Sequence, residues 1–248
     1  NFDRNSPWLD DDDPGWGASY SDREGSIIPG NSFDYPYIHG KAIMNAGKSF
    51  ISVSDEVFSS DAYNTDGFDA LDIILGEEKS TKSMTDPTQS DFRIYTPLFM
   101  KKMAAVASSR KGIFISGAYV GSEITDRKDT TALKFAKEYL HFNPRTGHAV
   151  KTGGVYPTDY SMHTFKDSFI FNTENRGEIY AAEAPDAIEP ADKQSVSAFR
   201  YSENNTSAGV MYNGNYKTLV VGFPFETIVS EESRNELMKQ IIDFFKTK

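Results

Sequence analysis

Residues 111–124, KGIFISGAYVGSEI, decide the fold expected of this chain. A short apolar run at 113–115 leads into the turn Gly117-Ala118-Tyr119-Val120-Gly121, and a helix-compatible segment follows. In α/β proteins this order exposes one side chain, here Tyr119, at the carboxyl end of a central strand. The flanking glycines let the backbone turn sharply without a Cβ clash. Enzymes that use this turn place a Cys or Ser nucleophile there, so the tyrosine bears directly on function.

Composition narrows the classes of function. The chain has 248 residues, 38% of them hydrophobic, and a formal net charge of −10. An acidic chain without a basic stripe is a poor partner for nucleic acid, and no apolar run is long enough to insert into a membrane. Cysteine is absent, which excludes disulfides, zinc–thiolate sites and cysteine nucleophiles.

The chain divides into an arm and a domain. Residues 1–37 lack helical or strand periodicity and are expected to form an extended arm, while 38–248 are expected to form one α/β domain. In that domain strands are expected at 49–53, 70–75, 113–116 and 218–221, alternating with helices. Between 148 and 215, short β-like runs predict a β-rich insertion, either an antiparallel extension or long loops. The alternation predicts a three-layer, mostly parallel open sheet with helices on both faces.

Three places resemble the class I glutamine-amidotransferase-like superfamily, which has a flavodoxin-like fold. The turn at 117–121 matches the family's Gly-x-Cys-x-Gly, and residues 73–77 match the glycine loop that helps to form its oxyanion hole. Residues 223–226, Phe-Pro-Phe-Glu, stand where the family has Phe-His-Pro-Glu. The resemblance thus puts Tyr119 in place of the nucleophile and Pro224 in place of the histidine, and it retains Glu226. Two losses from one triad argue against glutaminase chemistry.

Longer stretches at 1–10, 33–40 and 222–228 look like large secreted bacterial proteins known as xanthan lyases. This resemblance implies an extracytoplasmic protein, at the cell surface or secreted, that handles polysaccharide together with neighbouring modules. It does not imply that this domain performs the cleavage.

Candidate catalytic residues are few. Tyr119 is either the acid–base group of a carbohydrate-active enzyme or a packed tyrosine without a chemical role. Glu77 and Glu78, with Asp69 and Asp72, would supply paired carboxylates for glycoside hydrolysis, or they form a solvated loop. Glu226 is the third catalytic candidate, through the family resemblance.

Candidate binding residues lie mostly around the same strand ends. The binding candidates are Gly76, Glu78, Gly117, Gly121, His39 and Tyr37. The four histidines show no metal-ligand spacing, and the aspartates at 10–13 do not fit a calcium loop, so we expect no metal and no cofactor.

The sequence therefore predicts a catalytically degenerate amidotransferase-like domain with a binding or architectural role. The alternative is an active polysaccharide lyase or glycoside hydrolase that uses Tyr119 with nearby carboxylates.

Overall fold

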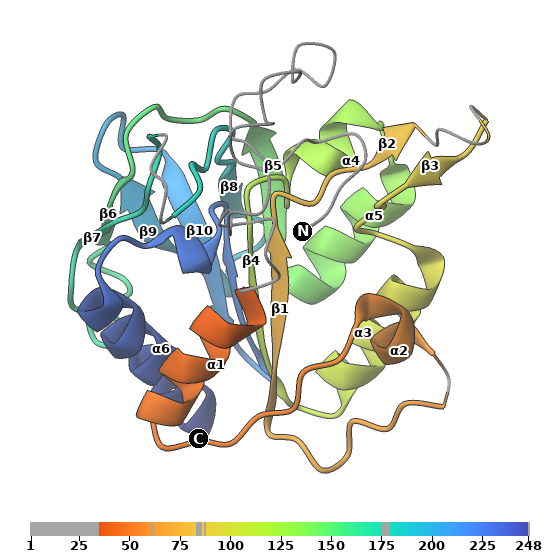
Figure 1. The fold of residues 1–248 in the computed structure, drawn as a ribbon, viewed down its shortest axis with the longest axis horizontal. Coiled ribbons are helices and arrows are strands. Elements are labelled where there is room, and N and C mark those ends of the chain that lie inside the picture. Colours follow the sequence, from red (N-terminus) through yellow and green to blue (C-terminus); the bar gives the residue numbers. More distant parts are fainter. Residues whose placement is uncertain (1–34, 61, 83–85, 87, 175–178, 248) are drawn as a thin grey trace, which may run out of the picture.

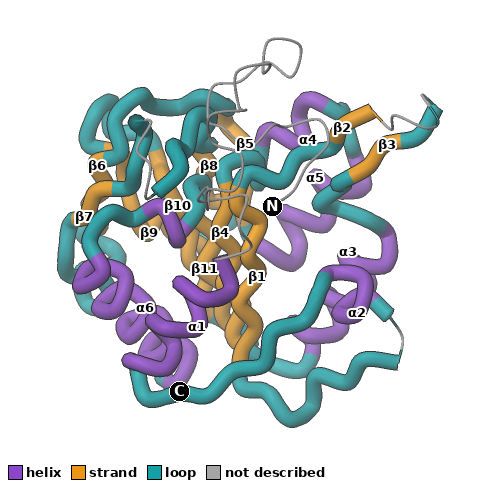
Figure 2. Tube along the Cα trace, viewed as in Figure 1, coloured by secondary structure: helices purple, strands orange, loops and turns teal. Residues whose placement is uncertain are grey.

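The computed structural model of the chain describes residues 35–60, 62–82, 86, 88–174 and 179–247. Seven strands form one mixed sheet in the order β1-β4-β11-β10-β9-β6-β7 (Figures 1 and 2). Its parallel part consists of β1 (Ala70–Gly76), β4 (Gly112–Gly117) and β11 (Lys217–Val221). The antiparallel part consists of β10 (Ser207–Asn213), β9 (Ser195–Tyr201), β6 (Gly154–Pro157) and β7 (Phe169–Ile170).

Two small antiparallel sheets complete the strands. One pairs β2 (Thr81–Lys82) with β3 (Ser90–Asp91), and the other pairs β5 (Phe142–Thr146) with β8 (Ala187–Pro190).

Helices cover the parallel part on its two faces. The longer ones are α1 (Tyr35–Asn45), α3 (Pro97–Ser108) and α6 (Glu231–Lys246). The short ones are α2 (Asp55–Ser59), α4 (Ser122–Asp126), α5 (Thr130–Phe135), the π-helix η2 (Ala136–Leu140) and the 3-10 helix η3 (Phe225–Thr227). Helices α1 and α6 pack on the face that carries Phe114 and Leu219, whereas α3, α5 and η2 pack on the face that carries Ile113 and Val220.

The predicted fold, a three-layer, mostly parallel open sheet of the flavodoxin-like type with helices on both faces, is wrong. The sheet is mixed, with four of its seven strands antiparallel to their neighbours, and it curls strongly into a half-barrel with few helices. The physical reason is the connection type: antiparallel strands are joined by short hairpins and need no crossover helix. The twist of such strands accumulates into curvature when no helical layer flattens the sheet. Aromatic side chains fill that half: Phe165, Phe169, Phe171, Phe199, Tyr201 and Phe223.

Local signals predicted several elements well. Thr96 caps α3 through a hydrogen bond from the Phe99 amide, with Pro97 in its first turn. Ser230 caps α6 in the same way, through the Ser233 amide. The strand expected at 49–53 is wrong, because these residues are exposed and pair with no strand among the described residues.

Residues 1–34 of the arm predicted at 1–37 lie outside the described residues, and the aspartates at 10–13 are among them. Its last three residues, 35–37, form the first turn of α1.

Candidate functional site

The turn after β4 lies against the end of β1. Gly76 pairs with Gly117, and the Ala118 amide donates a 2.8 Å hydrogen bond to the Gly76 carbonyl. A Cβ on Gly117 would lie 2.7 Å from the Leu75 Cβ, so only glycine fits there without a shift. Gly76 has φ of +55°, a left-handed conformation that favours glycine. The structure thus brings two predicted glycines together at the strand ends.

Tyr119 lies in the middle of this turn and is half-buried. Its ring packs against the apolar cluster under α3, and the Lys79 ammonium lies 4.8 Å from the ring centroid. Burial raises the pKa of the Tyr119 hydroxyl well above its usual value, and the charges of Glu77 and Glu183 raise it further. Within the described part of the chain, no histidine or arginine hydrogen-bonds this hydroxyl. A phenol in this setting is a poor base and a poor nucleophile.

A buried polar network lies behind the glycines. His39, from α1, places Nδ1 2.8 Å from Asp72 Oδ2 and Nε2 3.2 Å from Glu226 Oε2. The Tyr180 hydroxyl donates a 2.8 Å hydrogen bond to the other Glu226 oxygen. We call His39, Asp72, Tyr180 and Glu226 the strand-end network. It contacts the glycine loop, because a Cβ on Gly76 would lie 3.3 Å from Glu226 Oε1.

The charge of His39 follows from its two partners. Burial alone would lower the pKa of His39, but the charges and hydrogen bonds of Asp72 and Glu226 outweigh burial and raise it to about 9. At neutral pH the ring is therefore an imidazolium that donates from both nitrogens. Such a ring has no lone pair with which to accept a proton from a substrate or from Tyr119.

Another buried carboxyl group, that of Asp186, accepts hydrogen bonds from the backbone amides that follow Tyr119. Asp186 Oδ2 accepts hydrogen bonds from the Gly121 amide at 2.6 Å and from the Ser122 amide at 2.7 Å. Asp186 is fully buried, and burial raises its pKa to about 7. These two amides are therefore satisfied within the chain itself and are not open to a ligand.

The two predicted glutamates after β1, Glu77 and Glu78, are not part of the strand-end network. Glu77 Oε1 accepts a 3.2 Å hydrogen bond from the Glu183 amide, and its charge acts on both Tyr119 and Tyr180. The Glu78 amide closes a turn on the Leu75 carbonyl.

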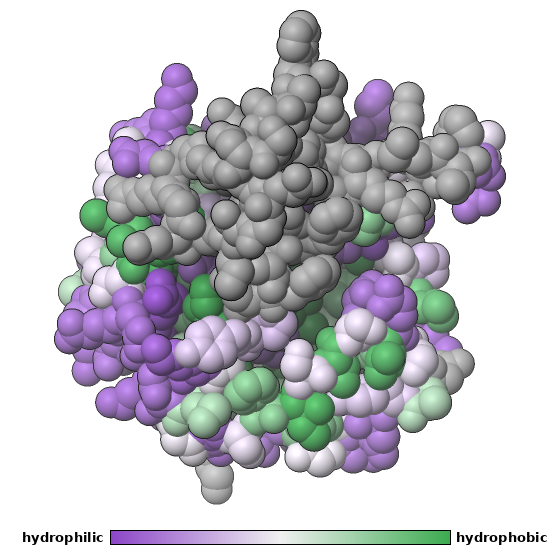
Figure 3. All heavy atoms as spheres, viewed as in Figure 1, coloured by the Kyte–Doolittle hydropathy of each residue, from purple (hydrophilic) through white to green (hydrophobic). Residues whose placement is uncertain are grey.

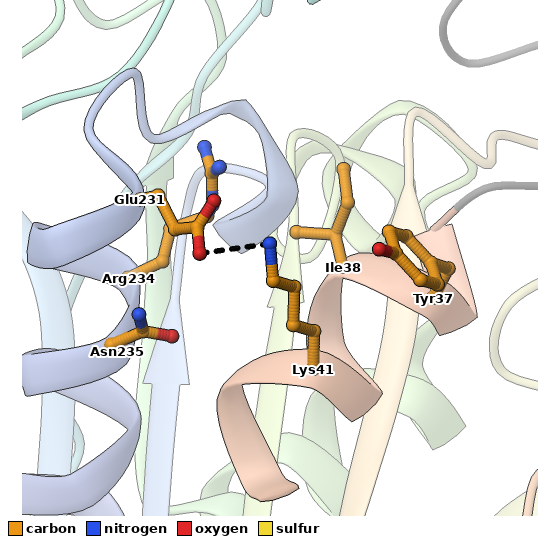
Figure 4. A pocket seen from close by; sticks show the side chains of 6 residues that line it. All are labelled: Tyr37, Ile38, Lys41, Glu231, Arg234 and Asn235. Atoms are coloured by element: carbon orange, nitrogen blue, oxygen red, sulfur yellow. Dashed lines mark ion pairs between the residues drawn. The ribbon is translucent and has the colours of Figure 1, made fainter. Parts of the chain in front are cut away.

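Tyr37 lies elsewhere. It is 67% exposed and lines a shallow groove between α1 and α6, where the side chains of Lys41 and Glu231 form a 2.8 Å ion pair (Figure 4). The structure therefore groups His39, Gly76, Gly117 and Glu226, and it leaves Tyr37 in a separate surface feature.

Sequence reasoning missed Tyr180 and Asp186. Asp186 had a readable signal: it lies in the mostly small and apolar run AAEAPDAI at 181–188, and a carboxylate in a buried segment needs hydrogen-bond partners. Tyr180 carried no comparable signal, because its partner Glu226 is 46 residues away. Asp72 was predicted only as a member of a carboxylate pair, although its position inside an apolar strand also indicates that it needs buried partners.

The described residues contain no cluster of three or more His, Asp or Glu side chains that could hold a metal ion. None of their helices is both long enough and apolar enough to cross a membrane.

Comparison with known proteins gives likeness of fold. No protein-family model matches the sequence, and no curated protein matches it. Among solved structures, the N-terminal domain of mmIFT52 superposes with a TM-score of 0.54 at 13% identity, over 84% of this chain and 89% of that one. The cytoplasmic protein STM3548 from Salmonella typhimurium superposes with a TM-score of 0.51 at 11% identity, over 85% of each chain.

A third structure is the exo-β-1,4-mannosidase Op5Man5 from Opitutaceae bacterium strain TAV5, with a TM-score of 0.50 at 8% identity. The match covers 98% of this chain but 33% of the mannosidase, so this fold corresponds to one part of that larger enzyme.

Proposed function

We propose that this chain is a catalytically degenerate domain with a binding or architectural role in a secreted protein that processes polysaccharide. The observation that carries the proposal is the state of His39. It is the histidine bound to Glu226 at the strand ends, and carboxylates occupy both of its ring nitrogens. Acid–base or nucleophilic catalysis needs a base with a free lone pair beside the reacting group.

Two further features support the absence of chemistry. The Tyr119 hydroxyl holds its proton more tightly than a free tyrosine, because burial and neighbouring carboxylates disfavour the phenolate. The amides of Gly121 and Ser122, which follow Tyr119 at the start of α4, are already satisfied by Asp186 and are not open to an anionic ligand. The nucleophile position and the histidine beside Glu226 are thus both unsuited to catalysis.

The polysaccharide part of the proposal has separate support. The stretches at 1–10, 33–40 and 222–228 resemble secreted proteins of that metabolism, and one structure with a similar fold is part of an exo-β-1,4-mannosidase. The partners proposed on this ground are a polysaccharide and neighbouring modules of a longer chain. The surface that would meet them includes Tyr119, Glu77 and Lys79.

The test is an assay for cleavage combined with an assay for binding. The purified chain is incubated with xanthan and with other uronate polysaccharides, and ultraviolet absorbance is followed for the unsaturated product that a lyase releases. Reducing-end release reports hydrolysis, and affinity electrophoresis in gels containing each polysaccharide reports binding. We expect no product, and we expect retardation in at least one gel if the role is binding.

Activity that Tyr119→Phe abolishes would overturn the proposal and establish a carbohydrate-active enzyme instead. Tyr160→Phe is the matched control, since Tyr160 is 79% exposed and belongs to a different loop. If neither product nor retardation is seen with any polysaccharide, the binding role is excluded and the architectural role is the one supported.

A further inference from the structure

The hairpin between β10 and β11 carries the one Asn-Gly pair of the sequence, Asn213-Gly214. Asn213 is the last residue of β10, and it pairs with Lys217, the first residue of β11. Asn213 and Gly214 are both exposed. Within the described part of the chain, no hydrogen bond holds the Asn213 side chain. Its amide carbon is therefore accessible to a neighbouring nucleophile.

The nearest nucleophile is the backbone nitrogen of Gly214. It can attack the side-chain carbonyl carbon of Asn213 and close a succinimide ring, and the side-chain nitrogen leaves as ammonia. Glycine eases this approach, because it has no Cβ to hinder the nitrogen. Water then opens the ring on either side and yields aspartate or isoaspartate. In the balance, an amide and a water molecule become a carboxyl group and ammonia.

The fold requires glycine at 214 and also restrains it. A Cβ on Gly214 would collide with the ring of Tyr212, which stacks on His141 with centroids 3.5 Å apart. The Gly214 amide donates a 3.1 Å hydrogen bond to the Tyr216 carbonyl. An amide in such a bond loses its proton only when the structure opens locally. The attack on Asn213 therefore needs the same local opening.

Tyr216 anchors this turn to the rest of the molecule. Its hydroxyl donates to the Tyr139 carbonyl at 3.0 Å and lies 2.9 Å from His141 Nε2. Tyr139 belongs to η2, so the turn is attached to that helix. Because the Gly214 amide bonds to the carbonyl of Tyr216 itself, loosening Tyr216 frees the amide.

We propose that Asn213 is a site of spontaneous deamidation, and that opening of the turn at 213–217 sets its rate. The reaction needs water alone as co-reactant. It is independent of the function proposed above, and it adds a negative charge to the tip of the β10–β11 hairpin.

Lys217 carries the effect of this modification towards α6. Its ammonium donates to the Phe244 carbonyl at 2.7 Å, near the end of α6. The outward side of α6 is largely hydrophilic (Figure 3), so the helix is held by its inner apolar stripe and by such contacts at its end. Isoaspartate lengthens the backbone by a carbon at the residue paired with Lys217. We expect this product to disturb the pairing and to loosen the end of α6.

The test follows deamidation of the full chain by peptide mapping with mass spectrometry. The folded chain and the chain in urea are incubated in parallel at mildly alkaline pH. In urea, we expect Asn213 to convert before every other asparagine, Asn215 included, because Tyr216 rather than glycine follows Asn215. In the folded chain, conversion of Asn213 should be slower by about tenfold or more. Mapping separates this site from Asp66-Gly67, where isoaspartate forms without a change in mass.

Three variants locate the control of the rate. Tyr216→Phe removes the anchoring hydroxyl and should speed conversion several-fold in the folded chain, with no change in urea. Tyr156→Phe is the matched control, because the Tyr156 hydroxyl bonds to Asn205 on the β9–β10 hairpin instead. Asn213→Asp carries the charge without the longer backbone, so the purified isoaspartate form should melt at a lower temperature than this variant.

Several results would overturn the proposal. Another asparagine that converts ahead of Asn213 in urea would exclude the site, as would an unchanged Asn213 under conditions that convert a synthetic peptide of residues 210–216. Equal rates in the folded chain and in urea, or no effect of Tyr216→Phe, would exclude control by the turn. Equal melting temperatures of the isoaspartate form and Asn213→Asp would exclude the effect on α6.

Discussion

Two histidines in this molecule each use both ring nitrogens in hydrogen bonds, but their partners and surroundings differ. His39 bonds two carboxylates, that of Asp72 within β1 and that of Glu226 after β11. His141 bonds Asp192 at 2.6 Å and the Tyr216 hydroxyl at 2.9 Å, near the amino end of β11. His39 is buried with a buried Glu226, whereas Asp192 is 38% exposed at its side chain.

The difference teaches that burial and the second partner decide what a carboxylate–histidine pair does. Around His39, the buried carboxylate of Glu226 and the partly buried carboxylate of Asp72 favour a positive charge on the ring, and the buried one in particular is expensive to leave unpaired. His141 has one carboxylate in contact with water and one neutral hydroxyl, and its ring stacks on Tyr212 with centroids 3.5 Å apart. Removing His141 therefore strands no buried charge.

The largest expected effect comes from His39→Leu. This change leaves Asp72 and Glu226 facing each other without a counter-ion, and we expect a loss of about 3–5 kcal/mol in the free energy of unfolding at pH 7. Chemical denaturation measures it. His163→Ala, at an exposed position, is the control and should change stability by less than about 0.5 kcal/mol. A loss below about 1 kcal/mol for His39→Leu would show that the network contributes little.

The pH dependence of stability sharpens the same comparison. Because the folded state raises the pKa of His39 from 6.5 to about 9, its contribution is fully present below pH 6.5 and is lost as the pH rises towards 9. The loss should be on the order of 3 kcal/mol, at 1.36 kcal/mol for each pH unit between the two values. Unfolding curves from pH 6 to 9.5 measure it. A wild-type chain as insensitive to pH in this range as His39→Leu would contradict a charged His39.

A smaller effect is expected from His141→Asn. His141 has φ of +61°, and asparagine tolerates that left-handed backbone better than alanine does. Loss of the ring's two hydrogen bonds and its stacking should cost about 1–2 kcal/mol. The pKa of Asp192 is lowered, since hydrogen bonds from His141 and nearby amides outweigh the effect of burial. Titration of Asp192 by NMR should show its pKa rising in the variant, and an unchanged value would exclude the pairing.

The smallest effect is expected from Tyr216→Phe. The Tyr216 hydroxyl donates to the Tyr139 carbonyl at 3.0 Å, and it lies within hydrogen-bond distance of His141 Nε2, at 2.9 Å. Its removal should cost about 0.5–1.5 kcal/mol, because the ring packing remains. Thermal unfolding measures the change, and a cost larger than that of His39→Leu would reverse the ranking of the two clusters.

Local signals in the sequence predicted the parallel half of the molecule. Thr96 and Ser230 indicate the starts of α3 and α6, because their side chains cap these helices. The apolar runs of β1, β4 and β11 predict buried strands. The glycines at 76 and 117 also followed from the turn pattern.

The antiparallel half of the sheet and the strand-end network could not be predicted from such local signals. The curl of the sheet depends on which of the weak β-like runs pair, and a run such as Phe169–Ile170 in β7 is too short to specify a neighbour. Segment 49–53 shows the converse error, since its strand-like alternation lacks a paired neighbour among the described residues. His39 and Glu226 were named separately, but their contact spans 187 residues and only the fold brings them together.

The hydrogen bonds of Asp186 have a consequence for local unfolding around this residue. The residue accepts from the Gly121 and Ser122 amides through its side chain, while its backbone amide donates to the Gly222 carbonyl at 2.7 Å. Three distant parts of the chain therefore meet at this one residue. If they open as one cooperative unit, hydrogen–deuterium exchange of these three amides should give the same free energy of opening, and it would then report cooperative unfolding in every variant discussed above.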